Sequence, residues 1–158
     1  GLKITLYNIN GLNPSSPSID FLNEWFFKTM HHEFAHILHQ TKNYSTDFNL
    51  ISTDYQGPSW LNLESDAVAI MMGYVTCYAS YSPDEDFVEI ISNYVTHAKG
   101  YWESVLATAG EEGGDKLARK FEIVRNYLQE SWGIDIDKLR DIVQKRSANI
   151  SQLDLKTL

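Results

Sequence analysis

The amino-acid sequence predicts an α+β protein that is mostly helical, with one short strand near its N-terminus. Residues 3–9 alternate in character and are rich in β-formers, which is typical of a strand. Between residues 19 and 40, apolar side chains recur at helical spacing and predict a long amphipathic helix. The sequence S-P-D-E at residues 82–85 predicts another helix start. Serine can cap the first turn, proline suits the first helical position, and glutamate follows three residues after the cap.

The remaining segments predict further helices joined by polar or glycine-containing connections. In the helix at 19–40 the expected buried stripe consists of Leu22, Phe26, Met30, Phe34 and Ile37 or Leu38. Loops are expected at residues 10–18, 41–60 and 110–114. Helices are expected at residues 63–72, from 82 to about 107, at 115–132 and at 135–148.

Length and composition exclude several classes of protein. The chain has 158 residues, about the size of one domain, with 43% hydrophobic and 13% aromatic residues to form a core. The net charge is −8, from 21 acidic and 13 basic residues, and no basic run occurs, so a nucleic-acid partner is not expected. The single cysteine, Cys77, excludes an internal disulfide and a zinc site built from thiolates.

The sequence H-E-F-A-H at residues 32–36 predicts a zinc site. His32 and His36 are four residues apart, so on a helix they share one face at about 6 Å along the axis. Both imidazoles can then reach one zinc ion at about 2.0–2.1 Å. Glu33 can take a proton from the water that zinc activates. The alternative is a helix with ordinary polar residues on its surface, but the large apolar neighbours favour a buried or cleft-lining site.

A zinc site of this kind needs a third protein ligand. His39 is close in sequence, but it lies about 10.5 Å from His32 along an unbroken helix, which leaves no room for His36. The metzincin arrangement is also absent, because it needs glycine and histidine where this chain has His39 and Lys42. We therefore expect His39 and His31 to support the ligands or to lie at the surface.

Three downstream carboxylates are candidates for the third ligand: Glu64, Glu85 and Glu89. Glu64 lies in a segment, N-L-E-S-D, that only faintly matches a thermolysin-type pattern. Glu85 and Glu89 are four residues apart and share a helix face, so one could bind zinc while the other orients a ligand histidine. Glu85 could instead only complete the capping interaction at its helix start.

Several of these segments are similar to a known family. The sequence E-D-F-V-E at residues 85–89 resembles the E-x-F-A-E element that follows H-E-x-x-H in several gluzincins, where the first glutamate binds zinc. T-M-H-H-E-F-A-H-I-L-H-Q at residues 29–40, with Y-A-S at 78–80 and residues 85–89, resembles the zinc-binding metallopeptidase lipoproteins of Bacteroidetes, a family associated with substrate import. The resemblance covers roughly residues 2–100, with Val88 in place of the more common alanine.

The resemblance implies a zincin-like catalytic domain that spans residues 1–158, with a small β-sheet remnant beside the active-site helix. Because zincins place several strands before that helix, we expect the chain to be the C-terminal part of a longer protein. The resemblance also implies a lipoprotein of the cell envelope, in the periplasm or at the outer-membrane surface. Its membrane attachment would be a lipid anchor outside this chain, and its partner would be an outer-membrane nutrient-uptake complex.

The expected function is zinc-dependent hydrolysis of a peptide or protein substrate. His32, His36 and Glu85 would hold zinc, and Glu33 would act as the general base. Tyr78 or Tyr81 could stabilise the developing oxyanion, and Tyr78 is preferred because it lies in the matched segment. Two alternatives remain: a non-catalytic zinc-binding envelope accessory of a nutrient-uptake system, and an interaction module with an accidental motif. A purely structural zinc site would have no use for a base at position 33.

Overall fold

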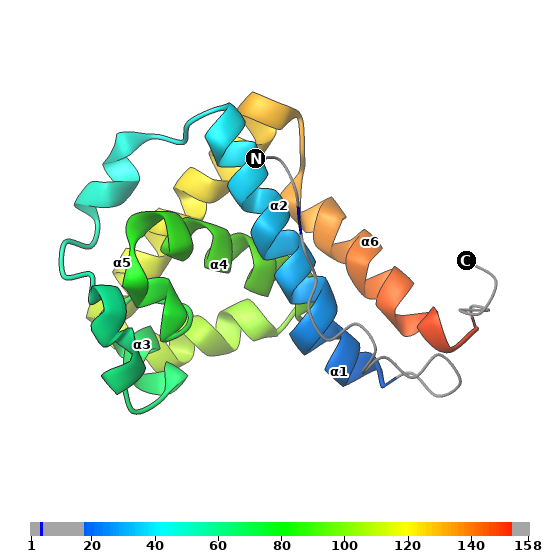
Figure 1. Cartoon of the computed structure of the whole chain (residues 1–158), viewed down its shortest axis with the longest axis horizontal. Coiled ribbons are helices and arrows are strands. Elements are labelled where there is room, and N and C mark those ends of the chain that lie inside the picture. The colour runs from blue at the N-terminus through cyan, green and yellow to red at the C-terminus, as the bar shows by residue number, and fades with distance from the viewer. Residues whose placement is uncertain (1–3, 5–17, 153–158) are drawn as a thin grey trace.

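Helices are the regular elements of this protein in the part that the computed structural model describes, namely Ile4 and residues 18–152 (Figure 1). The α-helices are α1 (Ile19–Leu22), α2 (Lys28–Thr41), α3 (Asp66–Met72), α4 (Pro83–Thr96), α5 (Tyr101–Trp132) and α6 (Ile136–Ala148). A π-helical turn, η2 (Asn23–Phe27), joins α1 to α2. The described residues also contain short 3₁₀ turns: η3 (Thr46–Leu50), η4 (Gly57–Asn62), η5 (Tyr78–Tyr81) and η6 (Ile150–Gln152).

The expected α+β class, with its β-sheet remnant, is wrong for the described residues, which contain no strand. The strand predicted at residues 3–9 lies outside them, apart from Ile4, which is not in a strand. Within the described residues, the buried face of α2 packs against α4 and the aromatic segment that follows α2 rather than against a sheet. Figure 1 shows α4 beside α2, and the segment after α2 adds Tyr44 and Phe48, whose rings pack on Phe87 of α4.

The π-helical turn changes which face of the first long helix is buried. Leu22 and Phe26 are buried as predicted, but Met30 and Phe34 are 45% and 50% exposed. A π-turn inserts one extra residue into the helix, and each residue of an α-helix rotates the face by about 100°. After the turn, the buried face is formed by His32, Ala35, Leu38 and His39, and of these only Leu38 belongs to the predicted stripe.

Helix α4 lies at the centre of the molecule. Its start confirms the prediction from the sequence, because the Ser82 hydroxyl accepts a hydrogen bond from the Glu85 backbone N–H and Pro83 occupies the first turn. Every residue from Asp86 to Thr96 is buried. The helix ends at Thr96 rather than near residue 107, and α5 begins at Tyr101.

A buried ion pair ties α4 to α5. The Asp86 carboxylate and the Lys120 ammonium lie 2.6 Å apart, and both side chains are fully buried. The same ammonium donates to the Gly73 carbonyl at 2.7 Å, and the Tyr55 hydroxyl donates to Asp86 at 2.8 Å. Buried charges are stable only with such partners. This network holds the first turn of α4 against α5 and the turn after α3.

The glycine segment predicted as a loop at residues 110–114 is a kink within α5. Gly110 has φ 68° and ψ −163°, a conformation that interrupts the helix there. Gly113 lies so close to α3 that a Cβ atom would be 2.5 Å from the Met71 carbonyl oxygen. Despite the length of α5, none of the described helices combines the length and apolar character needed to cross a membrane.

Candidate metal centre

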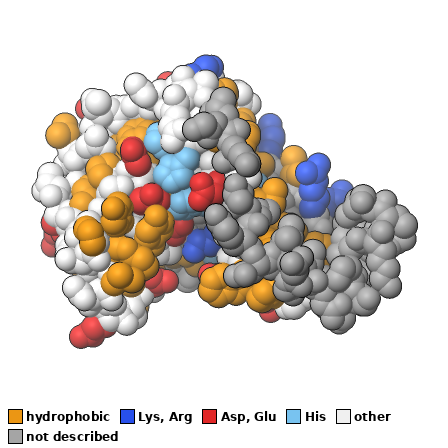
Figure 2. Space-filling view, in the orientation of Figure 1, with side chains coloured by type: hydrophobic (Ala, Val, Ile, Leu, Met, Phe, Trp, Pro, Cys, Tyr) orange, Lys and Arg blue, Asp and Glu red, His pale blue; other side chains and the backbone are white. Residues whose placement is uncertain are grey.

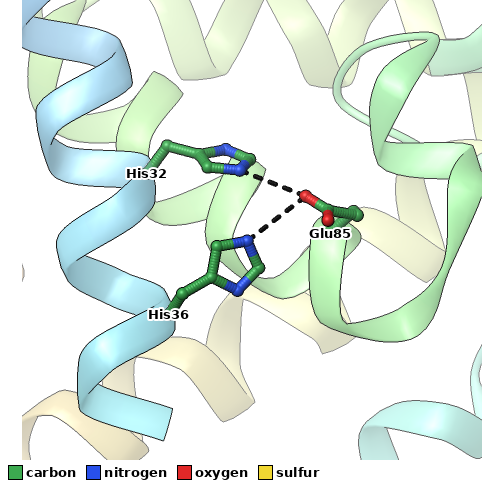
Figure 3. Close-up of side chains that lie close together, drawn as sticks. All are labelled: His32, His36 and Glu85. Atoms are coloured by element: carbon green, nitrogen blue, oxygen red, sulfur yellow. Dashed lines mark ion pairs between the residues drawn. The ribbon is translucent and has the colours of Figure 1, made fainter. Parts of the chain in front are cut away.

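Two histidines of α2 and one glutamate of α4 point toward a common position (Figure 3). His32 and His36 stand one turn apart on the same helix, as their spacing predicts. Their Nε2 atoms lie 3.1 Å and 3.3 Å from Oε2 of Glu85. Among the described residues, these are the three side chains whose potential ligand atoms cluster, all within 4.8 Å of one another.

Glu85 owes its place to the start of α4. The Ser82 cap and Pro83 set the first turn, and the Glu85 side chain then projects toward α2. Burial opposes the charged carboxylate, but the two histidines outweigh burial and hold the pKa of Glu85 well below its usual range. Glu85 is therefore an anion that faces two nitrogen donors.

The three side chains fit a zinc ion. In a tetrahedral zinc site with bonds of about 2.0–2.1 Å, neighbouring ligand atoms are about 3.3–3.4 Å apart. The two nitrogen–oxygen distances at Glu85, 3.1 Å and 3.3 Å, are close to this separation. Oε2 of Glu85 is also buried and makes no hydrogen bond of good geometry, although both histidine nitrogens lie within 3.3 Å, so a cation held among the three atoms would compensate its charge. Two imidazoles and one carboxylate are the donor set of known catalytic zinc sites.

Glu89 supports His32 from one turn further along α4. One carboxylate oxygen of Glu89 lies 2.8 Å from Nδ1 of His32. The other accepts from the Thr76 hydroxyl at 2.7 Å and from the Asn93 amide at 3.1 Å. Burial would lower the pKa of His32, but the carboxylates of Glu85 and Glu89 raise it to about 9. Glu89 therefore orients His32 and keeps its own oxygens occupied.

His36 is supported by a different kind of residue. Its Nδ1 atom lies 2.9 Å from Nε2 of His39, one turn further along α2. His39 is buried among aromatic rings, with Tyr44 at 5.6 Å and Phe87 at 6.3 Å between centroids. Burial lowers the pKa of His39, which favours a neutral imidazole.

The other candidates from the sequence lie outside the cluster. Glu64 is exposed and precedes α3. His31 is half-buried on another side of α2, and burial lowers its pKa. His39 contacts His36, but it contributes no atom to the cluster of potential ligand atoms. The tertiary structure therefore brings Glu85, and not Glu64, to the two histidines.

A hollow of about 540 Å³ opens beside the cluster and is lined by His32, Glu33 and Tyr78. Glu33 is exposed there, so water can reach its carboxylate. The Tyr78 ring lies 5.9 Å from the His32 ring and packs on Trp60 at 5.1 Å. Figure 2 shows histidine and acidic side chains together in the middle of this face, beside a group of hydrophobic side chains.

Tyr78 and Tyr81, the two tyrosines considered for an oxyanion role, occupy different surroundings. Burial and the nearby Glu85 carboxylate raise the pKa of Tyr78 to about 12. Tyr81 is 38% exposed and stacks on Tyr78 at 6.1 Å, but it does not line the hollow. Only Tyr78 combines a place in the hollow with a ring contact to a candidate ligand.

The structure also places residues in the site that the sequence analysis did not identify. Thr76 donates to Glu89, and Lys28 pairs with the same carboxylate at 3.6 Å. Lys28 lies one turn before His32 on the same helix, so its spacing in the sequence could have indicated that the two side chains share a face. Nothing in the sequence around Thr76 indicates its contact, because that contact depends on how η5 folds against α4.

An H-E-x-x-H helix faced by a glutamate from a second helix is the arrangement of a zinc metallohydrolase site. Comparison with known families agrees with this class. Residues 1–137 match the family described as "Putative zinc-binding metallo-peptidase", and the chain belongs to this family. The family resemblance found in the sequence is thereby confirmed.

A solved structure supports the same assignment. The chain is similar to a crystal structure of a "putative zinc-binding metallo-peptidase" from Bacteroides caccae ATCC 43185, with 41% sequence identity and a TM-score of 0.83. The match covers 92% of this chain and 55% of the Bacteroides caccae chain, so this chain spans about half the length of that protein. No curated protein shows significant similarity to the chain.

Proposed function

We propose that this protein is a zinc-dependent peptidase in which His32, His36 and Glu85 hold the metal and Glu33 is the general base. The observation that supports this proposal best is the meeting of three donors from two helices around one point. The nitrogen–oxygen distances there suit a tetrahedral zinc ion. Membership of a family described as zinc-binding metallopeptidases supports the same reaction class.

Bound zinc would lower the pKa of a coordinated water and polarise the scissile carbonyl. The protein side chains have their own roles. Glu33 accepts the proton of the attacking water, since its carboxylate is exposed in the hollow beside His32. Tyr78 is protonated at neutral pH, as an ordinary tyrosine is, and its pKa is raised further to about 12, so its hydroxyl can donate to the developing oxyanion. Glu89 orients His32 through their hydrogen bond.

The position of Glu33 favours hydrolysis over the alternative of a non-catalytic zinc-binding accessory. Glu33 contributes no atom to the ligand cluster, so holding the metal does not require it. It lies instead in a hollow of about 540 Å³, which has room for part of a substrate chain next to His32. The envelope location, the lipid anchor and the nutrient-uptake partner remain predictions.

The test combines metal analysis with cleavage of a peptide library. We expect about one zinc per chain after zinc supplementation, and cleavage that stops when a chelator removes the metal. Glu33→Gln should keep the zinc and lose at least about 100-fold in turnover, the usual minimum contribution of a general base. Glu64→Gln is the matched control, because Glu64 is exposed and outside the cluster, and it should behave like the wild type.

Three results would count against the proposal. Zinc content near zero would exclude the metal site. A zinc-loaded protein that cleaves nothing in the library would favour the accessory function. Unchanged turnover in Glu33→Gln would remove Glu33 from the mechanism while leaving the metal site intact.

A further inference from the structure

We propose that His39 is a positioning residue for the metal centre: its imidazole accepts a hydrogen bond from His36 and so aims His36 at the metal. The inference rests on the zinc site proposed above. It assigns a role to a histidine that is neither a candidate ligand nor part of the hollow.

The two ring nitrogens of His36 face different partners. Nε2 lies 3.3 Å from Oε2 of Glu85, on the side of the ligand cluster. Nδ1 lies 2.9 Å from Nε2 of His39. A neutral histidine that binds a metal through Nε2 has its proton on Nδ1, so His36 must donate in this contact. His39 must then accept through Nε2 and have its own proton on Nδ1.

The surroundings of His39 hold its ring in the accepting position. His39 as a whole is only 7% exposed. The ring packs edge-on against Tyr44 and Phe87, which stack on each other at 4.1 Å with an interplanar angle of 9°. The Tyr44 hydroxyl is in turn fixed by donation to Asp84 at 2.6 Å. A ring confined in this way cannot swing to another partner without disturbing the aromatic core.

The two candidate ligand histidines thus receive support from different groups. His32 is supported by the Glu89 carboxylate, which also pairs with Lys28 at 3.6 Å. His36 is supported by the His39 imidazole, whose ring is enclosed by aromatic side chains. Each candidate ligand histidine therefore has a separate partner at its Nδ1 atom.

The test compares three variants by zinc competition with a chromophoric chelator. His39→Phe keeps an aromatic ring but removes the acceptor, and it should weaken zinc binding by about 10–100-fold. His39→Gln places an amide oxygen where Nε2 stood and should bind zinc within about threefold of the wild type. His31→Phe, the matched control on the same helix, should leave zinc affinity unchanged because His31 is outside the cluster. Unfolding with chelator present measures any loss of fold stability separately.

A second measurement needs no variant. In the ¹⁵N-labelled, zinc-loaded wild type, long-range ¹H–¹⁵N NMR should show His39 as the Nδ1–H tautomer and His36 protonated at Nδ1. A proton on Nε2 of His39 would overturn the inference, as would wild-type zinc affinity in His39→Phe, or equally poor binding by His39→Gln and His39→Phe. In each of these cases the wild type still binds zinc, so the proposed function stands. A wild type that binds no zinc would overturn both.

Discussion

Replacement of Glu85 by alanine tests the metal centre most directly. The substitution removes the carboxylate whose Oε2 lies 3.1 Å and 3.3 Å from the two histidine nitrogens. The helix cap survives, because Ser82 binds the backbone N–H of residue 85 rather than its side chain. The variant therefore changes the donor set while it keeps the start of α4.

The expected loss can be estimated from the number of donors. Zinc binds structural sites with about 10–16 kcal/mol from four ligands, or roughly 2.5–4 kcal/mol per ligand. Loss of Glu85 should therefore weaken zinc binding by about 10²–10³-fold. Glu89→Ala should weaken it less, by about 10–100-fold, because Glu89 acts through His32. Glu64→Ala should have no effect, since Glu64 is exposed and outside the cluster.

The assay is zinc affinity by chelator competition at constant pH, with unfolding in chelator as the control for stability. The order of losses matters more than their absolute size. Wild-type affinity in Glu85→Ala, together with a large loss in Glu64→Ala or Glu89→Ala, would refute the assignment of Glu85 as third ligand. The two histidines would remain candidates in that case.

Three further predictions concern pH, a buried ion pair and a close helix contact. The folded-state pKa of His32 is raised to about 9, so a proton competes with zinc for this side chain below that pH. Zinc affinity should therefore rise about tenfold per pH unit from pH 7 and level off above pH 9. With chelator present, the stability of the fold depends on pH in the opposite direction. The proton on His32 stabilises the folded chain, so urea denaturation should show stability falling as the pH rises from 6.5, the ordinary pKa, through about 9. Lys120→Met should cost about 3–5 kcal/mol in urea denaturation because it leaves Asp86 buried and unpaired, and a loss below about 1 kcal/mol would contradict the role of this pair. Gly113→Ala should cost about 1–3 kcal/mol by forcing α3 and α5 apart, whereas Gly114→Ala, with only ordinary contacts at 3.7 Å and 4.0 Å, should not destabilise the protein. Equal stability of the two alanine variants would show that the helices separate without cost.

Local sequence was sufficient to predict those features that depend only on residues close together in the chain. The spacing of His32 and His36 places both on one helix face wherever that helix packs. The start of α4 is likewise encoded in consecutive residues, because a serine cap and a proline act within one turn. These features, together with the family resemblance, were sufficient to predict a zinc site on this helix.

Two errors came from interactions that the local pattern does not contain. The buried stripe was wrong at Met30 and Phe34, because a π-turn before α2 rotates the register by one residue. The α+β class was wrong for the described residues, because α4 and the aromatic segment after α2 pack beside α2, where a small sheet was expected. Neither the extra residue in a turn nor the choice of covering element follows from periodicity.

Tertiary packing also decides which of the candidate carboxylates faces the two histidines. Glu64, Glu85 and Glu89 are equally able to bind zinc as isolated side chains, and their distance in sequence from α2 says nothing about their distance in space. Packing of α4 against α2 directs Glu85 at both histidines and Glu89 at the back of His32. The contact between His36 and His39 depends in the same way on the aromatic rings that confine His39. The sequence by itself thus determined the helical pair of histidines and the glutamate beside them, while the fold decided which side chains face them, because only packing sets distances between residues far apart in the chain.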